Sequence, residues 1–318
     1  MSIWLTVSFW LLGHWGCVTH RSYRTAKTQQ QNKKKSFEKR SGSLLDAARR
    51  LLDAGRVYDA QKKLREIADD SASPVRNRAR ACWLILQTNK VRDPQAYWDL
   101  LERFPTTVAA EDALREAIRL ERGSPKTLVW KLVAFYKKYP HTLSAELALL
   151  EAAHLASSIP ALAWQDYALH LLAFLARYHP ESPHRDAALY RAARLCHAQG
   201  RWADAIYFLK QLLQTKETSF WFGDYNSEWL DDAQLLLGDV YLAQDKKKKA
   251  IKAWSALPRR FPHSRLRDRA WVRLMRVHEN LGNHTHACLA ARTLLEQIPK
   301  SRFAPEAAVF LARCQQFP

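Results

Sequence analysis

The stretch RRFPHSRLRDRA, residues 259–270, carries the pattern that decides the fold. In it, Phe261 precedes Pro262, Ser264 stands two residues after the proline, and Ala270 stands six residues after the serine. The same offsets recur at Phe104-Pro105 with Thr107 and Ala113, Tyr139-Pro140 with Thr142 and Ala148, His179-Pro180 with Ser182 and Ala188, and Ile298-Pro299 with Ser301 and Ala307. A single occurrence would indicate one loop entering one helix, whereas recurrence at fixed offsets indicates a repeated structural unit.

Each residue of the pattern has a physical role at a helix boundary. Proline cannot continue the preceding helix, and a Ser or Thr hydroxyl accepts a hydrogen bond from the free amides of the next helix, which stabilises it by about 1 kcal/mol. The alanine lies on the new helix, and four residues later, on the same face, stands a second small or apolar residue. These second residues are Ala117, Ala152, Ala192, Leu274 and Leu311. We therefore predict a helix cap at each hydroxyl and a close contact between helices at each alanine.

The spacing of the corners indicates the size of the unit. Successive prolines are 35, 40, 82 and 37 residues apart. The long interval divides at Ser227 and Ala233, which repeat the offset from hydroxyl to alanine, with Tyr225 in place of the proline. Periods in this range are typical of stacked helical hairpins. Few segments alternate apolar and polar residues, so strands are not expected.

The repeats resemble the tetratricopeptide repeat (TPR) family, whose pattern spans about 34 residues. The matching positions are Gly238, Tyr241, Asp245, Ala250, Trp254, Leu257 and Pro262; Met275, His278, Gly282, Ala287, Ala291, Leu294 and Pro299; Ala193, Cys196, Gly200, Ala205, Leu209 and Leu212; and Ala48, Leu51, Gly55, Ala60, Leu64 and Ile67. The resemblance implies an all-α fold, an α-solenoid of about seven hairpins over residues 44–318 that forms a right-handed superhelix.

The style of the corners is similar to that of a narrower group. Repeats punctuated by aromatic-Pro-x-Ser resemble those of periplasmic TPR proteins of Gram-negative bacteria. This group includes the lipoprotein of the outer-membrane β-barrel assembly machine (BamD-like) and the TPR partner of the Tol-Pal system.

Residues 1–17 have the composition of a targeting segment. The apolar run from Ile3 to Gly16 is shorter than the about 20 residues that cross a bilayer and suits the core of a signal peptide. It ends at Cys17, and a basic polar linker, residues 18–43, follows. This layout resembles a bacterial lipoprotein, cleaved before Cys17 and acylated on its thiol. A targeting segment without lipid and a buried N-terminal helix remain alternatives, because no Lys or Arg precedes the apolar run.

The chain is strongly basic. Lys and Arg number 50 against 31 Asp and Glu, which gives a net charge of +19. Such a surface is compatible with simple solvation, with an acidic protein or membrane surface, and with nucleic acid. No recognition helix or RNA-binding motif accompanies the charge, which argues against nucleic acid.

The five cysteines do not indicate a disulfide scaffold. None forms a CxxC motif, and Cys82, Cys196, Cys288 and Cys314 lie within the repeats, where cysteine acts as a small apolar residue. Their spacing in a chain of this length argues against a disulfide framework.

Motifs of catalysis are missing from the sequence. It contains no phosphate-binding loop, no GxSxG elbow and no HExxH. His284 and His286 fall at an expected hairpin turn, and Asp231 and Asp232 fall near a helix start, where carboxylates complement the helix dipole. We therefore expect no enzyme activity, no cofactor and no metal.

One segment departs from the repeat. TSFWFGDYNSEWL, residues 218–230, adds residues between two repeats and brings together Phe220, Trp221, Phe222, Tyr225 and Trp229. Either these rings cover the following helix, or Trp221 and Phe222 protrude as a contact for a partner, since interfaces favour large aromatic residues.

We expect a non-enzymatic protein-binding scaffold of the bacterial cell envelope, lipid-anchored on the periplasmic side, with the outer membrane favoured. In TPR relatives the first helices of the hairpins line a concave groove, which here implies partner contacts at Tyr190, Arg194, His197, Asp232, Asp239, Leu242, Arg269, Arg276 and Glu279. Two alternatives remain. One is a lipoprotein that binds a glycan or another anionic envelope polymer, and the other is a cytoplasmic or inner-membrane adaptor with a basic tail.

Overall fold

The computed structural model describes residues 40–214, 218–219, 223–224 and 228–314. The chain divides into two compact units. The N-terminal unit runs to Arg122 and includes His141–Ser144, and the C-terminal unit comprises Gly123–Pro140 and Ala145–Pro318. Cys17, Trp221 and Phe222, which the sequence singles out, lie outside the described residues.

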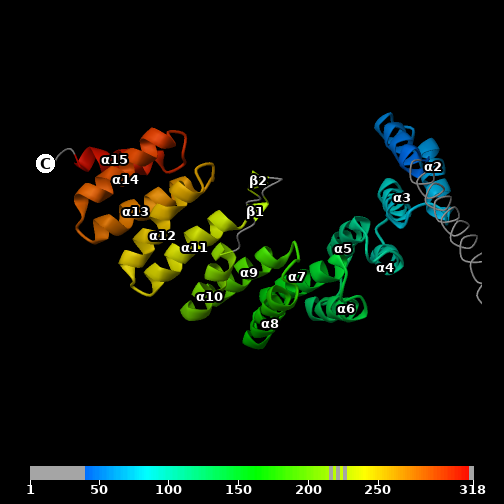
Figure 1. The fold of residues 1–318 in the computed structure, drawn as a ribbon, viewed down its shortest axis with the longest axis horizontal. Coiled ribbons are helices and arrows are strands. Elements are labelled where there is room, and N and C mark those ends of the chain that lie inside the picture. The colour runs from blue at the N-terminus through cyan, green and yellow to red at the C-terminus, as the bar shows by residue number, and fades with distance from the viewer. Residues whose placement is uncertain (1–39, 215–217, 220–222, 225–227, 315–318) are drawn as a thin grey trace, which may run out of the picture. The chain divides into compact units, whose positions relative to one another are not determined.

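The N-terminal unit consists of helices that pack in sequence order. Residues 40–53 are helical, so the described helix already includes positions that the sequence assigns to the linker. Then follow α2 (Val57–Asp69), α3 (Val75–Thr88), α4 (Pro94–Arg103) and α5 (Val108–Leu120). α2 packs on α3 and α4 packs on α5 (Figure 1).

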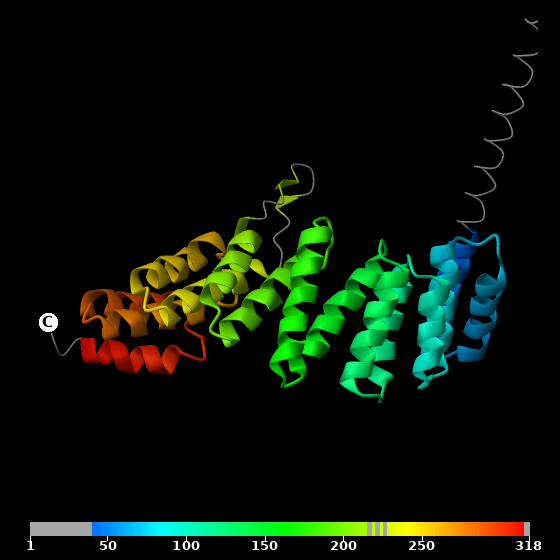
Figure 2. The same ribbon diagram turned by 90° about the horizontal axis from the view of Figure 1, so that it is seen from below.

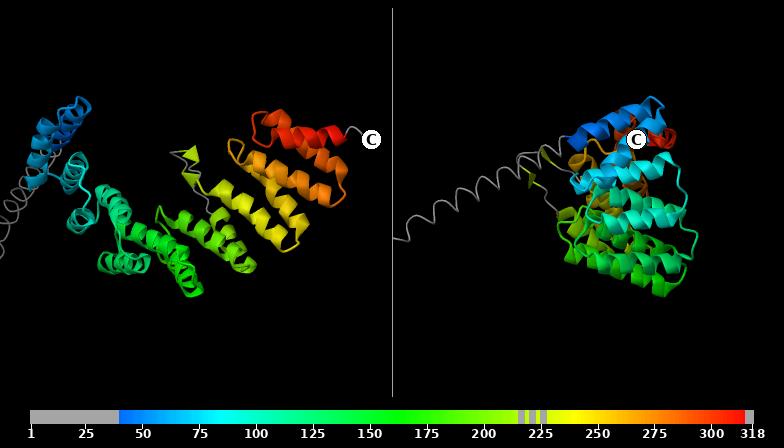
Figure 3. Two further views of the ribbon diagram at one scale, coloured as in Figure 1. Left: turned by 180° about the vertical axis from the view of Figure 1, so that it is seen from behind. Right: turned by 90° about the vertical axis from the view of Figure 1, so that its right-hand side faces the viewer.

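The C-terminal unit continues with longer helices. They are α6 (Pro125–Lys138), α7 (Leu143–Ser158), α8 (Leu162–Tyr178), α9 (Arg185–Ala198), α10 (Trp202–Gln214), α11 (Leu230–Ala243), α12 (Lys247–Arg260), α13 (Arg267–Asn280), α14 (His284–Gln297) and α15 (Ala304–Cys314). From α8 onward each helix packs on the next one, and Figures 2 and 3 show α11 to α14 as successive antiparallel rods. The expected all-α fold of stacked TPR-like hairpins is confirmed.

A short strand pair interrupts the helices. β1 (Thr218–Ser219) and β2 (Gly223–Asp224) pair antiparallel, with Thr218 opposite Asp224 and Ser219 opposite Gly223. The segment 218–230, where the sequence departs from the repeat, thus contains a pair of two-residue strands. The composition of this segment did not indicate strands.

The alanines of the repeated corner are fully buried. Ala113, Ala148, Ala188, Ala270 and Ala307 are each 0% exposed. Of the residues four positions further on, Ala117, Ala152 and Ala192 are also 0% exposed, and Leu274 is 3% exposed. A methyl side chain at these positions lets the backbones of neighbouring helices come close, as the sequence predicts.

The corners share one backbone turn. The amide of the hydroxyl residue donates to the carbonyl of the residue before the proline, at 3.2 Å for Thr107, 3.1 Å for Ser182, 3.0 Å for Ser264 and 2.9 Å for Ser301. This bond closes the chain around the proline, which ends one helix and sets the direction of the next.

The predicted helix caps are correct at one corner and wrong at three. Thr107 is the N-cap of α5 and accepts the amide of Ala110 at 3.3 Å. After Ser182, Ser264 and Ser301 the helix begins three residues later, and the hydroxyl accepts the amide two residues ahead. The reason is an extra turn between the hydroxyl and the helix, which moves the hydroxyl away from the free amides of the first helical turn.

Two of these serines instead connect neighbouring hairpins. Ser264 donates its hydroxyl to Asp231 at 2.5 Å, and Ser301 donates to Asp268 at 2.8 Å. In each case the acceptor lies at the start of the first helix of the preceding hairpin. The hydroxyl therefore ties one repeat to the next.

The turns inside the hairpins also share one geometry. A residue with positive φ, Gly55, Gly200, Asp245 or Gly282, follows the first helix, and the next amide donates to the carbonyl five residues back. These bonds measure 2.8 Å at Arg56, Arg201 and Lys246 and 2.9 Å at Asn283. This is the Schellman arrangement, which favours glycine because other residues are strained at positive φ.

Gly238 allows the closest contact between two helices of the C-terminal unit. A Cβ at this position of α11 would overlap the indole ring of Trp254 on α12. Trp254 is 1% exposed, and its Nε1 donates to the carbonyl of Leu235 at 3.1 Å and to Asp239 at 3.2 Å. The indole is thus held in place and cannot move away from a larger residue.

The cysteines correct one expectation from the sequence. Cys288 of α14 and Cys314 of α15 form a disulfide, with their Cα atoms 6.1 Å apart. Burial raises the pKa of the Cys196 thiol to about 11, which keeps this buried thiol protonated. One covalent link therefore joins the last two helices, which the spacing alone did not reveal.

We expect Gly238→Ala to lower the free energy of unfolding by about 1–3 kcal/mol, since overpacking against a fixed ring forces the helices apart. The midpoint of thermal unfolding, followed by circular dichroism, measures the effect. Gly42→Ala is the matched control, because no atom lies within 4 Å of a Cβ there. An unchanged midpoint for Gly238→Ala would contradict the contact.

We expect Asp245→Gly to raise the free energy of unfolding by roughly 0.5–1 kcal/mol, because φ at this position is 55°. The exposed ion pair with Lys247 that is lost contributes little. The reciprocal change Gly200→Asp, at φ 73°, should lower stability. Urea unfolding measures both free energies. If the two changes altered the free energy of unfolding in the same direction and by the same amount, backbone strain would not determine stability at these turns.

Candidate functional site

The first helices α9, α11 and α13 of the C-terminal unit bring several predicted contact residues together. Tyr190 of α9 donates its hydroxyl to Asp232 of α11 at 3.3 Å, and its ring lies 5.1 Å from that of Trp229. Burial, followed by the charge of Asp232, raises the pKa of Tyr190 to about 12. Tyr190 is therefore a neutral hydrogen-bond donor at physiological pH.

Asp232 lies between charges of both signs. Burial first, and the neighbouring carboxylate of Asp231 second, raise its pKa, while Arg269 and Arg194 act in the opposite direction. Arg194 of α9 also lies with its guanidinium 6.0 Å from the centre of the Tyr190 ring. Charges of both signs thus lie close together from α9 to α13.

Two other predicted contact residues, Asp239 and Arg276, form ion pairs with residues of neighbouring helices. Both oxygens of Asp239 accept from Arg273 of α13, at 2.5 and 2.8 Å, and one also accepts from Trp254. Arg276 forms a bidentate pair with Glu306 of α15, at 2.9 Å for both bonds. These residues hold α11, α13 and α15 together. From the repeat pattern alone, a residue that bonds a neighbouring helix cannot be told from one that binds a partner.

Three further predicted residues are Leu242, Glu279 and His197. Leu242 is 41% exposed and Glu279 is exposed. The ring of His197 lies 5.3 Å from that of Trp202. None of the three contacts the Tyr190–Asp232 pair through an interaction that the structure describes.

A depression opens beside Tyr190 and has a volume of about 420 Å³. Its polar rim comes from α7 and α9, and its apolar floor from α7, α8 and α9. The lining residues are Ala153, His154, Ser157, Leu172, Tyr190, Arg191, Arg194, Leu195, Ala198 and Trp229. The combination of an apolar floor, two guanidiniums and an aromatic wall is suited to the side chains of a polypeptide.

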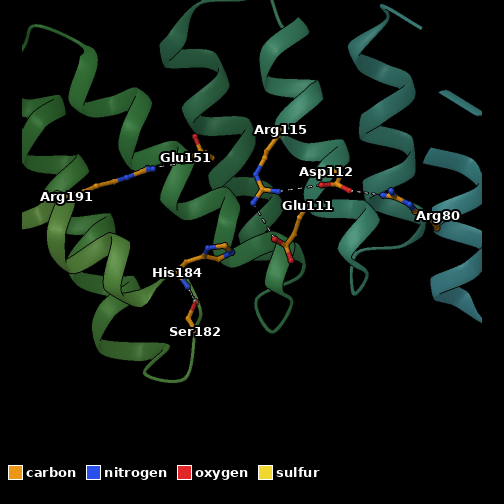
Figure 4. A network of polar contacts seen from close by, with 8 residues as sticks. All are labelled: Arg80, Glu111, Asp112, Arg115, Glu151, Ser182, His184 and Arg191. Carbon is orange, nitrogen blue, oxygen red and sulfur yellow. Dashed lines mark hydrogen bonds and ion pairs between the residues drawn. The ribbon is translucent and has the colours of Figure 1, made fainter. Parts of the chain in front are cut away.

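Sequence reasoning did not select Arg191 or His154 for this depression. Arg191 lies 4.0 Å from Glu151 and donates to the carbonyl of Leu150 at 3.4 Å (Figure 4). It follows Tyr190 directly, whereas the groove positions implied by the resemblance are Tyr190, Arg194 and His197 on this helix, so Arg191 was missed. In principle, the density of arginines in RAARL, residues 191–195, could have indicated it.

A second depression, of about 410 Å³, lies near the C-terminal end of the described chain. It includes Glu279, a predicted contact residue, together with Met275, Pro305, Glu306, Val309, Phe310 and Arg313. The N-terminal unit has its own polar network, in which Asp112 lies 3.1 Å from Arg80 and 3.7 Å from Arg115 (Figure 4).

Within the described part of the chain, no group of three or more His, Cys, Asp and Glu side chains could hold a metal ion. Nor does any helix among the described residues have the length and apolar character needed to span a membrane.

Comparisons with known proteins support the repeat assignment. The family model named Tetratricopeptide repeat matches residues 232–264, which cover α11, α12 and the corner at Ser264. TPR proteins are in general non-catalytic scaffolds, and TPR domains in general bind protein partners. A search of curated proteins found no match.

Several solved structures share the helical architecture. PilW, described as a widely conserved type IV pilus biogenesis factor, is 13% identical with a TM-score of 0.40, and the match covers 82% of this chain and 95% of PilW. A TPR protein from Parabacteroides merdae has the same identity and a TM-score of 0.41, with coverage of 86% and 98%. PilF of Pseudomonas aeruginosa is 13% identical with a TM-score of 0.34, with coverage of 87% and 97%. At these values we base no functional argument on the likeness.

We expect Asp232→Asn to raise the melting temperature more at about pH 7 than at about pH 3. The folded protein holds the proton of Asp232 more tightly than the unfolded chain, since the folded-state pKa is raised above 3.8. The stability contribution of this group is therefore complete below the unfolded pKa and is lost as the pH rises through the folded one. Asparagine cannot ionise and still accepts from Tyr190. The same shift at both pH values would contradict this.

Proposed function

We propose that this chain is a protein-binding scaffold of the bacterial cell envelope, held by a lipid on Cys17 at the periplasmic side and acting in envelope or outer-membrane assembly. The partner binds along the first helices of the C-terminal unit. A non-enzymatic role agrees with the inert, buried thiol of Cys196 and with the TPR match.

The first-helix face around Tyr190 supports binding of an extended polypeptide segment. It offers a depression lined by apolar and basic side chains, and beside it the half-buried pair Tyr190–Asp232. Arg194 is exposed and contributes to the rim, so it is available for a backbone carbonyl or a carboxylate of the partner. Stacked hairpins commonly bind partners on such surfaces.

The disulfide between Cys288 and Cys314 is the observation that supports an extracytoplasmic compartment. Disulfides persist in oxidising compartments such as the periplasm and are rare in the reducing cytoplasm. The same compartment follows from a lipoprotein-type segment that ends at Cys17. The resemblance of the corners to those of BamD-like and Tol-Pal-associated TPR lipoproteins agrees with both.

A labelling experiment tests the anchor and the compartment together. We expect the full chain, expressed in a Gram-negative bacterium with labelled palmitate, to carry the label and fractionate with membranes, and Cys17→Ser to lose both. Alkylation before reduction should leave Cys288 and Cys314 unmodified. An unlabelled, soluble protein with both thiols alkylated would support the cytoplasmic adaptor and contradict the proposal.

A photo-crosslinking residue at position 194 tests the binding face. In intact cells it should yield a defined crosslinked polypeptide, whereas the same residue at exposed Tyr58 of α2 should not. A glycan adduct at position 194 would instead indicate an envelope polymer as the ligand.

A further inference from the structure

An exposed aromatic surface lies on helices α6 and α8, which are neighbouring second helices of the repeat. We define this α6–α8 face by Lys126, Trp130 and Lys137 of α6 and by Trp164 and Tyr167 of α8. It belongs to the C-terminal unit and is formed by different helices from the first-helix face around Tyr190.

The three rings of this face support one another. The ring centre of Trp130 lies 5.8 Å from that of Trp164 and 5.4 Å from that of Tyr167, and the latter two are 6.1 Å apart. The interplanar angles of 62°, 43° and 84° are those of edge-on and tilted contacts, which favour a fixed arrangement. The rings therefore present a preorganised surface.

The buried side chains of α6 do not include Trp130. Buried side chains on α6 face its neighbours, namely Leu128, Val129, Leu132, Val133 and Phe135. Trp130, in contrast, is 54% exposed. A large exposed indole beside other rings is unfavourable in water unless a partner covers it, and such patches mark interaction sites.

The charge around the rings has one dominant sign. α6 contains Lys126, Lys131, Lys137 and Lys138 and no Asp or Glu. The ammonium group of Lys126 lies 6.0 Å from the ring centre of Trp164. Among the described residues, neither Lys126 nor Lys137 forms an ion pair. On α8, Asp166 is paired with Arg201 at 3.4 Å. A partner that approaches this face therefore meets Lys126 and Lys137 without paired carboxylates.

The spacing of these cations defines the length of the partner segment. Lys126, Trp130 and Lys137 are all exposed and are separated by four and seven residues, so they lie on one face of α6. The distance along the helix between the two lysines is about 16 Å. A segment of similar length can place an apolar side chain on Trp130 and a carboxylate near each lysine.

We propose that the α6–α8 face binds an acidic, amphipathic segment of a partner protein. Apolar side chains of the segment cover Trp130, and its carboxylates pair with Lys126 and Lys137. We favour a protein over a bilayer as the occupant for two reasons. Lys126, Trp130 and Lys137 follow one another along one face of a helix, as contacts to a partner segment would. Trp164 and Tyr167 are half-buried and do not protrude as rings that enter a membrane would. This site is additional to the first-helix face and does not depend on lipid anchoring.

The test uses the full chain and two synthetic helical peptides with the same apolar residues, one with Glu and one with Lys at all polar positions. We expect the acidic peptide to bind in fluorescence anisotropy and the basic one not to bind. Trp130→Ala should weaken binding by at least about tenfold, the loss expected for a central aromatic contact, and Trp130→Phe should retain most of it. Lys126→Glu/Lys137→Glu should reverse the preference between the peptides.

Matched variants separate this site from general attraction to a basic protein. Lys248→Glu/Lys252→Glu on α12 changes the net charge by the same amount at exposed positions four residues apart, and Tyr58→Ala removes a ring that is 79% exposed. Both should leave the affinity unchanged, and circular dichroism confirms folding of each variant. If they weaken binding as much as the α6 variants, or if neither peptide binds, the proposal is wrong.

Two further measurements identify other occupants. Vesicles of phosphatidylcholine with phosphatidylglycerol test for a membrane, and a Trp130→Ala effect on vesicle binding alone would overturn the proposal. Arg194→Glu should leave binding of the acidic peptide at α6 intact. The outcome at the first-helix face and the outcome at the α6–α8 face can therefore be distinguished.

Discussion

The close approach of neighbouring helices at buried alanines is the constraint on which the structure depends. Ala113, Ala148, Ala188, Ala270 and Ala307 are fully buried and follow their corners at the same offset. A larger side chain at any of them would separate two backbones and change the angle at which the next hairpin packs. At the corners before Ala113, Ala188, Ala270 and Ala307, a turn closed by the amide of the hydroxyl residue brings the alanine to the contact. Turn and contact together set the geometry of every repeat.

This regularity determines what the surface can do. Because successive first helices are held at similar positions, residues such as Tyr190, Asp232 and Arg269 come from three hairpins and still meet at one place. The second helices follow the same rule, which brings Trp130 to Trp164. In a molecule of this kind, binding surfaces arise from rows of residues across repeats.

Much of the fold was accessible from the sequence, because prolines, buried alanines and turn glycines act locally. The site was less accessible. Asp239 and Arg276 occupy groove positions, yet their partners Arg273 and Glu306 lie on other helices, at distances along the chain that no local pattern encodes. The hydroxyls of Ser264 and Ser301 likewise donate to carboxylates of the preceding hairpin, which no local pattern indicates. Predicting the disulfide from the sequence would require knowing that α14 and α15 are adjacent.

The bond between Cys288 and Cys314 has a consequence for how the stack comes apart. In a stack of helices, a helix that buries few of its own side chains opens locally more readily than one with a continuous core. Among the residues of α15, Ala307 alone is buried, so noncovalent contacts hold this helix weakly. The covalent link keeps α15 on α14 and covers the apolar surface that fraying would expose to proteases and to other chains. Reduction of the bond would leave α15 attached to α14 by noncovalent contacts alone.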